Sequence, residues 1–153
     1  MDLALLKEVA FFEGLTAGQL AKVAEIGTLR SVPAGTFIFS EGDDGDDMYV
    51  VMRGKVRISK QVPGIGEEAL AILGPGQYFG EMAIIEDSPR SADAIAHSGC
   101  ELLVFSRRRL DELMFTDKDL AYVLLWAFVH TLSSRLRETS DKLKAFFAIS
   151  RFE

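Results

Sequence analysis

The chain lacks the residues that build disulfides and most metal centres. Its single cysteine, Cys100, permits no internal disulfide and no cysteine metal cluster. The apolar residues 102–104 that follow it indicate a small buried side chain instead. With only two histidines, His97 and His130, the sequence also offers little for a histidine-rich metalloenzyme. We therefore expect neither a metal nor a cofactor.

Cationic surface and long apolar runs are also scarce. The formal net charge is −6, which argues against broad nucleic-acid binding, because such binding rests on cationic contacts to phosphate. The one basic run, Arg107–Arg109, is expected to be a solvated face. The apolar stretch 120–129 is about 10 residues long, too short to span a membrane. The first residues lack the basic flank and cleavage site of a signal peptide, so we expect a cytoplasmic protein.

The composition is that of an ordinary globular domain. The 153 residues are 48% hydrophobic and 26% charged, which predicts one domain over residues 1–153. A helical pattern covers residues 3–9. Thr16 then resembles an N-cap for a helix that runs to about Glu25 and ends at Gly27.

From about residue 28 to 106 the pattern changes to short strands separated by glycine-bearing turns. The expected strands cover residues 37–40, 48–52, 55–59, 70–73, 91–96 and 101–105. A loop is expected at residues 63–66. Many short strands at this spacing predict a closed barrel or sandwich, not a parallel sheet.

Helices are expected again over residues 107–148. A short one covers 107–114, and a longer one begins near Thr116, its predicted N-cap. Within the long helix a heptad seam recurs at Leu125, Val129, Leu132, Leu136, Thr139, Leu143 and Phe146. The first turns, with Leu120, Val123, Leu124 and Trp126, are apolar nearly all round and are expected to lie on the barrel. Beyond Ser133 only the seam stays apolar, which favours a partner helix over packing on the chain's own barrel.

Residues 79–92 carry the most informative pattern. Gly80 allows a tight turn or a close approach to a ligand. Residues 81–86 are expected to form a short helix whose first N–H groups are unpaired and face an anion. Arg90 can bind phosphate oxygens and Ser91 adds a hydroxyl, while Glu81 can accept hydrogen bonds from a sugar. The alternative is that Glu81 and Arg90 simply pair with each other.

This segment resembles the phosphate-binding cassette of the cyclic nucleotide-binding domain family, in the form G-E-x-A-x-(x)n-P-R-[AST]-A. Upstream residues fit as well, among them Gly35, 41–42, 48–51, 54–56 and 76–81. The resemblance implies an α+β, mainly β fold: an antiparallel β-barrel or jelly roll with N-terminal helices and a long C-terminal dimerisation helix.

It also implies the roles of individual residues. Glu81 would bind the ribose 2′-hydroxyl and Arg90 the cyclic phosphate. Backbone amides of Met82 and Ala83, with Gly80 beside them, and the Ser91 side chain would complete the contacts. Ile58, Leu70, Ala71 and Leu73 would line the pocket. Asp93 departs from the threonine of several members; as an exposed carboxylate near the phosphate, it would weaken binding by about 1 kcal/mol.

Residues 135–143 resemble the dimerisation helix of the bacterial cAMP receptor group of regulators. There a Thr-Ser pair contacts the adenine amino group, and the second residue of the pair reaches the neighbouring subunit's ligand. Thr139 and Ser140 match that pair, so the resemblance implies these roles for them. A polar residue in a heptad seam also sets register, so that simpler role stays open for Thr139. Because the chain ends at Glu153, without a winged helix-turn-helix, direct DNA binding is not expected.

Together these features predict a non-enzymatic sensor that binds a cyclic nucleotide, cAMP in preference to cGMP. It would form a homodimer through its C-terminal helix and act on a downstream protein that the sequence does not identify. One rival, a cupin-like metalloenzyme, needs clustered histidines that this sequence does not have. A second rival is an interaction module that keeps the fold without the ligand.

Overall fold

The computed structural model describes residues 3–151 and begins with helices. These are α1 (Leu3–Lys7), a 3-10 turn η1 (Ala10–Phe12) and α2 (Ala17–Ile26). Eight strands follow: β1 (Thr28–Val32), β2 (Phe37–Phe39), β3 (Asp47–Arg53), β4 (Val56–Val62), β5 (Gly66–Leu73), β6 (Tyr78–Phe79), β7 (Asp93–Ala96) and β8 (Cys100–Ser106). The short α3 (Met82–Ile85) separates β6 from β7, and α4 (Arg107–Thr116) and α5 (Lys118–Ser150) complete the described chain.

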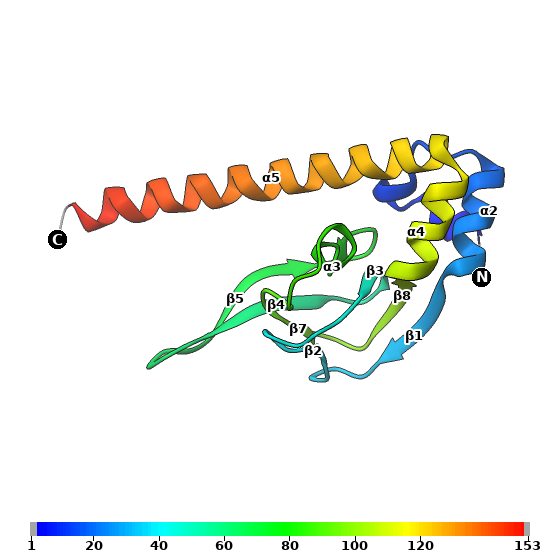
Figure 1. Cartoon of the computed structure of the whole chain (residues 1–153). Coiled ribbons are helices and arrows are strands. Elements are labelled where there is room, and N and C mark those ends of the chain that lie inside the picture. The colour runs from blue at the N-terminus through cyan, green and yellow to red at the C-terminus, as the bar shows by residue number, and fades with distance from the viewer. Residues whose placement is uncertain (1–2, 152–153) are drawn as a thin grey trace.

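The strands form two antiparallel sheets of four. Their orders are β1-β8-β3-β6 and β2-β7-β4-β5. Buried residues of both sheets, such as Val51 and Leu102 on one and Val56 and Ala94 on the other, share one apolar core. The prediction of a mainly β, antiparallel barrel or jelly roll with N-terminal helices and a long C-terminal helix is confirmed (Figure 1).

A second apolar cluster joins the helices to the first sheet. Leu120 and Leu124 of α5 are fully buried in it, together with Phe105 of β8. This confirms the prediction that the first turns of the long helix pack on the barrel. Trp126 is the exception, because half of its surface is exposed. Cys100 is buried, as predicted.

Side chains at the helix starts explain where the helices begin. The Thr16 hydroxyl accepts the N–H of Gln19, and the Gln19 side chain accepts the N–H of Thr16, so the predicted N-cap is confirmed. The prediction of Thr116 as a cap is wrong. Thr116 ends α4 and its hydroxyl donates to backbone carbonyls of that helix, while the carboxylate of Asp117 caps α5 by accepting the N–H of Leu120 at 3.0 Å.

Two strands, β1 and β6, have no counterpart among the expected strands. Four of the five residues of β1 are exposed, so its sequence has no alternation of buried and exposed positions, and only its pairing with β8 defines it. The β4–β5 hairpin is longer than expected, because its register continues to the pair Val62 and Gly66. It projects from the barrel on the same side as the far half of α5 (Figure 1).

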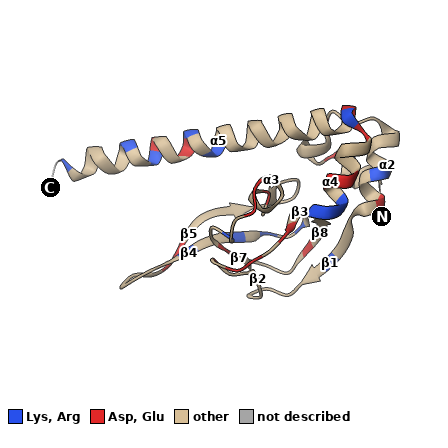
Figure 2. Ribbon diagram, in the orientation of Figure 1, with Lys and Arg blue, Asp and Glu red and all other residues tan. Residues whose placement is uncertain are grey.

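Helix α5 extends well beyond the barrel. Most of its seam is solvent-exposed in the single chain; Leu136 is 68% exposed and Phe146 64%. Charged residues lie at its start and in its far half, with a long uncharged stretch between them (Figure 2). No helix within residues 3–151 has the length and hydropathy needed to cross a membrane.

Candidate functional site

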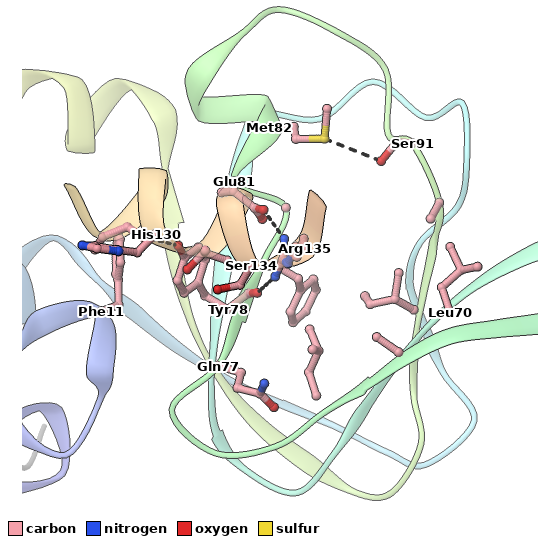
Figure 3. Close-up of a pocket in the computed structure, with 18 of the residues that line it drawn as sticks. Phe11, Leu70, Gln77, Tyr78, Glu81, Met82, Ser91, His130, Ser134 and Arg135 are labelled. Carbon is pink, nitrogen blue, oxygen red and sulfur yellow. Dashed lines mark hydrogen bonds and ion pairs between the residues drawn. The ribbon is translucent and has the colours of Figure 1, made fainter. Parts of the chain in front are cut away.

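A cavity of about 930 Å³ lies between α5, the second sheet and the 79–92 segment. Its lining brings together eleven of the twelve predicted site residues: Ile58, Leu70, Ala71, Leu73, Gly80, Glu81, Met82, Ala83, Arg90, Ser91 and Thr139. Ser140 does not line it. Figure 3 shows Leu70, Met82 and Ser91 at one end of this cavity and Phe11 and His130 at the other.

The turn before α3 depends on Gly80. Its φ is +78°, and a Cβ atom there would lie 3.0 Å from Nη1 of Arg90 and 3.1 Å from the carbonyl oxygen of Asp47. The structure thus shows the predicted tight turn, and the atoms close to Gly80 belong to the protein itself. The N–H of Ala83 donates to the Gly80 carbonyl at 3.2 Å, so the prediction that the first N–H groups of this helix are unpaired is wrong for Ala83.

Arg90 is a buried cation without an anionic partner among the described residues. It is 7% exposed and forms no ion pair with any residue of the described range 3–151. Its guanidinium carbon lies 4.2 Å from the ring centroid of Phe39, and Nη1 donates to the Gly80 carbonyl at 3.4 Å. Its buried Nε has no hydrogen-bond partner in the part of the chain that the structure describes. Because a buried charge is stable only when it is paired, this geometry favours an external anion.

The carboxylate of Asp47 interacts electrostatically with the Arg90 cation. Burial raises the pKa of Asp47 and neighbouring Asp46 adds to the rise, whereas the Arg90 cation lowers it. The net pKa is raised, so the attraction to Arg90 is outweighed.

Glu81 pairs with Arg135 of α5, so the alternative pairing of Glu81 with Arg90 is wrong. The Glu81 side chain is 2% exposed, and Nη1 of Arg135 donates to its Oε1. Nη2 of Arg135 donates to the carbonyl of Tyr78 at 2.7 Å. Figure 3 shows this link near the middle of the cavity. In the sequence, Arg135 was grouped with the charged residues that flank the seam. Its position one turn before Thr139, a predicted site residue, could have indicated that it lies on the same face of the helix.

Two further contacts hold α5 against the barrel. The Tyr78 hydroxyl donates to the carbonyl of Ala127 at 3.2 Å, and burial raises the pKa of Tyr78 to about 12. Farther along, Nζ of Lys142 donates to the carbonyl of Leu70 on the edge strand β5 at 3.5 Å. Helix α5 is therefore one wall of the cavity.

The remaining predicted residues form an end of the cavity that is partly apolar and partly polar. Leu73 is buried, whereas Leu70 is about half exposed. The Ser91 hydroxyl lies 3.9 Å from the sulfur of Met82. The Thr139 hydroxyl donates to the carbonyl of Arg135 at 2.8 Å, which leaves its oxygen lone pairs able to accept a hydrogen bond.

The prediction that Asp93 is an exposed carboxylate is wrong. Asp93 is 5% exposed on β7, where it pairs in register with Ser59 of β4. Its Oδ1 accepts the N–H of Glu41 at 2.7 Å. This strand is covered by the loop that follows β2, and the carboxylate is held by that loop instead of facing solvent.

The two histidines lie in different places. Nδ1 of His97 is 3.0 Å from Nη1 of Arg57 near the end of β7, and the His130 ring lies beside Trp126 on α5. They do not come together as a pair of metal ligands.

The Arg135–Glu81 link makes a testable contribution to stability. We expect Arg135→Met to lower the free energy of unfolding by about 1–3 kcal/mol, because it leaves a buried carboxylate without its cation. The partial exposure of Arg135 keeps the effect below that of a fully buried pair. Adding Glu81→Gln should restore most of the loss. Urea unfolding of both variants measures this, with exposed Arg137→Met as the control; equal losses in the two single arginine variants would contradict it.

Comparison with known proteins identifies the family of the chain. The cyclic nucleotide-binding domain family matches residues 29–117. The CRP-like cAMP-activated global transcriptional regulator of Mycobacterium tuberculosis is 28% identical over 139 residues, which are 91% of this chain and 60% of that protein. The cyclic AMP receptor protein of Thermus thermophilus is 38% identical over 102 residues, 67% of this chain and 47% of that one.

A solved structure of the same family also matches this chain. A cyclic nucleotide-binding domain from Methylobacillus flagellatus superposes with a TM-score of 0.81 at 26% identity, covering 92% of this chain and 79% of that one. The chain thus spans about half to three-fifths of the length of the two curated relatives. The family match covers more than half of the sequence and includes the cassette, so the chain belongs to the cyclic nucleotide-binding domain family.

Proposed function

We propose that this domain is a non-enzymatic sensor that binds a cyclic nucleotide, cAMP in preference to cGMP, and signals through α5 to a protein partner in the cytoplasm. The observation that carries the proposal is the buried, unpaired guanidinium of Arg90 on the wall of the cavity. A cyclic phosphate is the anion that it would bind. The relatives named for cAMP support the choice of ligand.

Each part of the ligand has a matching surface. Arg90 and Ser91 would bind the phosphate, and Glu81 would accept a hydrogen bond from the ribose 2′-hydroxyl. The apolar wall, with Ile58 and Leu73, would contact the base. The Thr139 hydroxyl donates to its own helix, so its oxygen is suited to accept a hydrogen bond from the adenine amino group; guanine has a carbonyl acceptor there. This favours cAMP.

Glu81 links ligand binding to the helix. Its carboxylate is bonded to Arg135, so a ribose hydroxyl must share Glu81 with Arg135 or displace it. The bound and free states would then differ in how firmly α5 is held at Arg135. A ligand shifts a conformational equilibrium only by such a difference in affinity between two states.

The exposed seam supports a homodimer. Leu125, Val129, Leu136, Leu143 and Phe146 are each at least half exposed in the single chain, at heptad spacing. A second α5 packed in parallel would cover this stripe. Ser140, which lies outside the chain's own cavity, would then be free to reach the partner's ligand.

The ligand-free interaction module remains a second candidate. It is favoured by one observation, the direct pairing of Glu81 with Arg135, which already satisfies the carboxylate that a ribose would need. Such a module would keep the fold and the helix pair but bind no nucleotide.

Calorimetric titration with cAMP and cGMP separates the two candidates. For the sensor, we expect one site per chain and tighter binding of cAMP than of cGMP. A thermal-shift assay should agree, because a ligand at 100 times its dissociation constant stabilises the fold by about 2.7 kcal/mol. Binding of neither nucleotide at millimolar concentration would reject the sensor in favour of the module.

A further inference from the structure

The buried carboxylate of Asp93 has a defined partner in the loop of residues 40–46, which connects β2 to β3. Asp93 is 5% exposed, and its Oδ1 accepts the N–H of Glu41 at 2.7 Å. A carboxylate at this depth is stable only when it is hydrogen-bonded, and a hydrogen bond to a charged acceptor is among the stronger ones in proteins. The buried position of Asp93 therefore depends on its hydrogen bond to the N–H of Glu41.

Three hydrogen bonds join the 40–46 loop to residues 90–93. Besides the Asp93 bond, the N–H of Gly42 donates to the carbonyl of Arg90 at 2.8 Å, and the N–H of Arg90 donates to the carbonyl of Asp43 at 2.9 Å. Of these, the Asp93 bond alone uses a side chain. It is thus the one that a substitution can remove without changing the backbone.

The far end of the same loop packs against the guanidinium of Arg90. A Cβ atom at Gly45 would lie 2.6 Å from both Nε and Nη2 of Arg90, so the backbone there is in close contact with the cation. Phe39, which comes directly before the loop, has its ring centroid 4.2 Å from the guanidinium carbon. Movement of the loop would therefore release the cation from its fixed orientation.

We propose that Asp93 is a positioning residue for the phosphate site: its carboxylate holds the 40–46 loop in place, and the loop fixes the guanidinium of Arg90. This inference rests on the proposed function, in which Arg90 binds the phosphate. Positioning and charge act in opposite directions here, since a negative charge near the site would weaken binding of an anion. Asparagine separates the two effects, because it keeps the acceptor oxygen and removes the charge.

The test compares cAMP affinity by calorimetry in the wild type, Asp93→Ala, Asp93→Asn and a control. Ser98→Ala is the control: the Ser98 hydroxyl also accepts a backbone N–H, that of Lys55 at 3.0 Å, but Ser98 does not line the cavity. We expect Asp93→Ala to weaken binding about tenfold, Asp93→Asn to stay within about threefold of wild type, and Ser98→Ala to bind normally even if its melting temperature falls.

Two further arms keep the result decisive. If Asp93→Ala does not fold, Asp93→Val replaces it, because valine has no atom that can accept the Glu41 N–H and suits a strand. The NMR signal of the Arg90 Nε–H is recorded without ligand. It should broaden or exchange faster in the alanine or valine variant than in wild type or Ser98→Ala.

The outcomes are distinct. Unchanged or tighter cAMP binding in Asp93→Ala, or an equal loss in Asp93→Asn, would overturn the positioning role. If the wild type binds no cyclic nucleotide, the proposed function fails, and the Arg90 signal alone decides the role of Asp93. An Arg90 signal that is unaffected by the Asp93 substitution would then reject the inference.

Discussion

Arg90→Met should weaken cyclic nucleotide binding by roughly 30-fold or more, because truncating one side of a buried, hydrogen-bonded charge pair costs about 2–5 kcal/mol or more. Met has a similar length and flexibility and carries no charge. The free protein should not be destabilised. Its Arg90 is 7% exposed and forms no ion pair within residues 3–151, so removing the cation also removes a buried charge that lacks a partner.

Calorimetry with cAMP measures the loss, and urea unfolding measures the stability of the free protein. Arg108→Met is the matched control: it removes the same charge from an exposed helix position, where Arg108 pairs with Glu112 one turn away. The control should bind like wild type. An Arg90→Met protein with wild-type affinity would show that the phosphate does not lie at this guanidinium.

Leu136→Glu should convert the proposed dimer to a monomer at micromolar concentration. Leu136 lies in the middle of the seam and is 68% exposed in the single chain. Burying a leucine contributes about 1.5–3 kcal/mol, and a two-fold symmetric pair loses two of them, which corresponds to a weakening of roughly 100-fold or more. Two facing carboxylates add repulsion.

Sedimentation or light scattering over a range of concentrations measures the association. Ala148→Glu is the control, since it adds the same charge to α5 at an exposed position outside the seam. It should remain dimeric. A wild-type protein that is monomeric at about 100 μM, or a Leu136→Glu variant that associates as the wild type does, would contradict the proposed helix pair.

Some strands could be predicted because their apolar runs are buried, as residues 48–52 of β3 and 94–96 of β7 are. The alternation in residues 55–59 is followed only in part, since Val56 is buried but Ile58 is half-buried and Ser59 is fully buried. Strand β1 lacks that signal, because four of its residues are exposed and its hydrogen bonds to β8 hold it in the sheet. The start of α5 was misplaced by one residue, since Thr116 and Asp117 are both good capping types and only the structure shows which side chain reaches Leu120.

The site was predictable as far as it is local in sequence. Residues 80–91 are close together in the chain, and the cavity collects the ones that the cassette pattern named. The two contacts that the sequence did not reveal join distant segments. Arg135 reaches Glu81 across 54 positions, and Asp93 accepts the N–H of Glu41 across 52. No local pattern identifies such partners, and in both cases the charge on the residue led to the expectation that it faces solvent.

The length of α5 determines how far a tilt at Arg135 would displace the far end of the helix. Between Arg135 and Ile149 the helix runs for about 21 Å, and Lys142 is the residue in that stretch with a hydrogen bond to the rest of the described chain. A tilt of about 10° pivoting at Arg135 would carry the far end through roughly 4 Å. A small rearrangement at the contact between Glu81 and Arg135 would thus produce a displacement of at least an atom's diameter at the far end of the helix. That end lies outside the barrel, where another molecule could contact it.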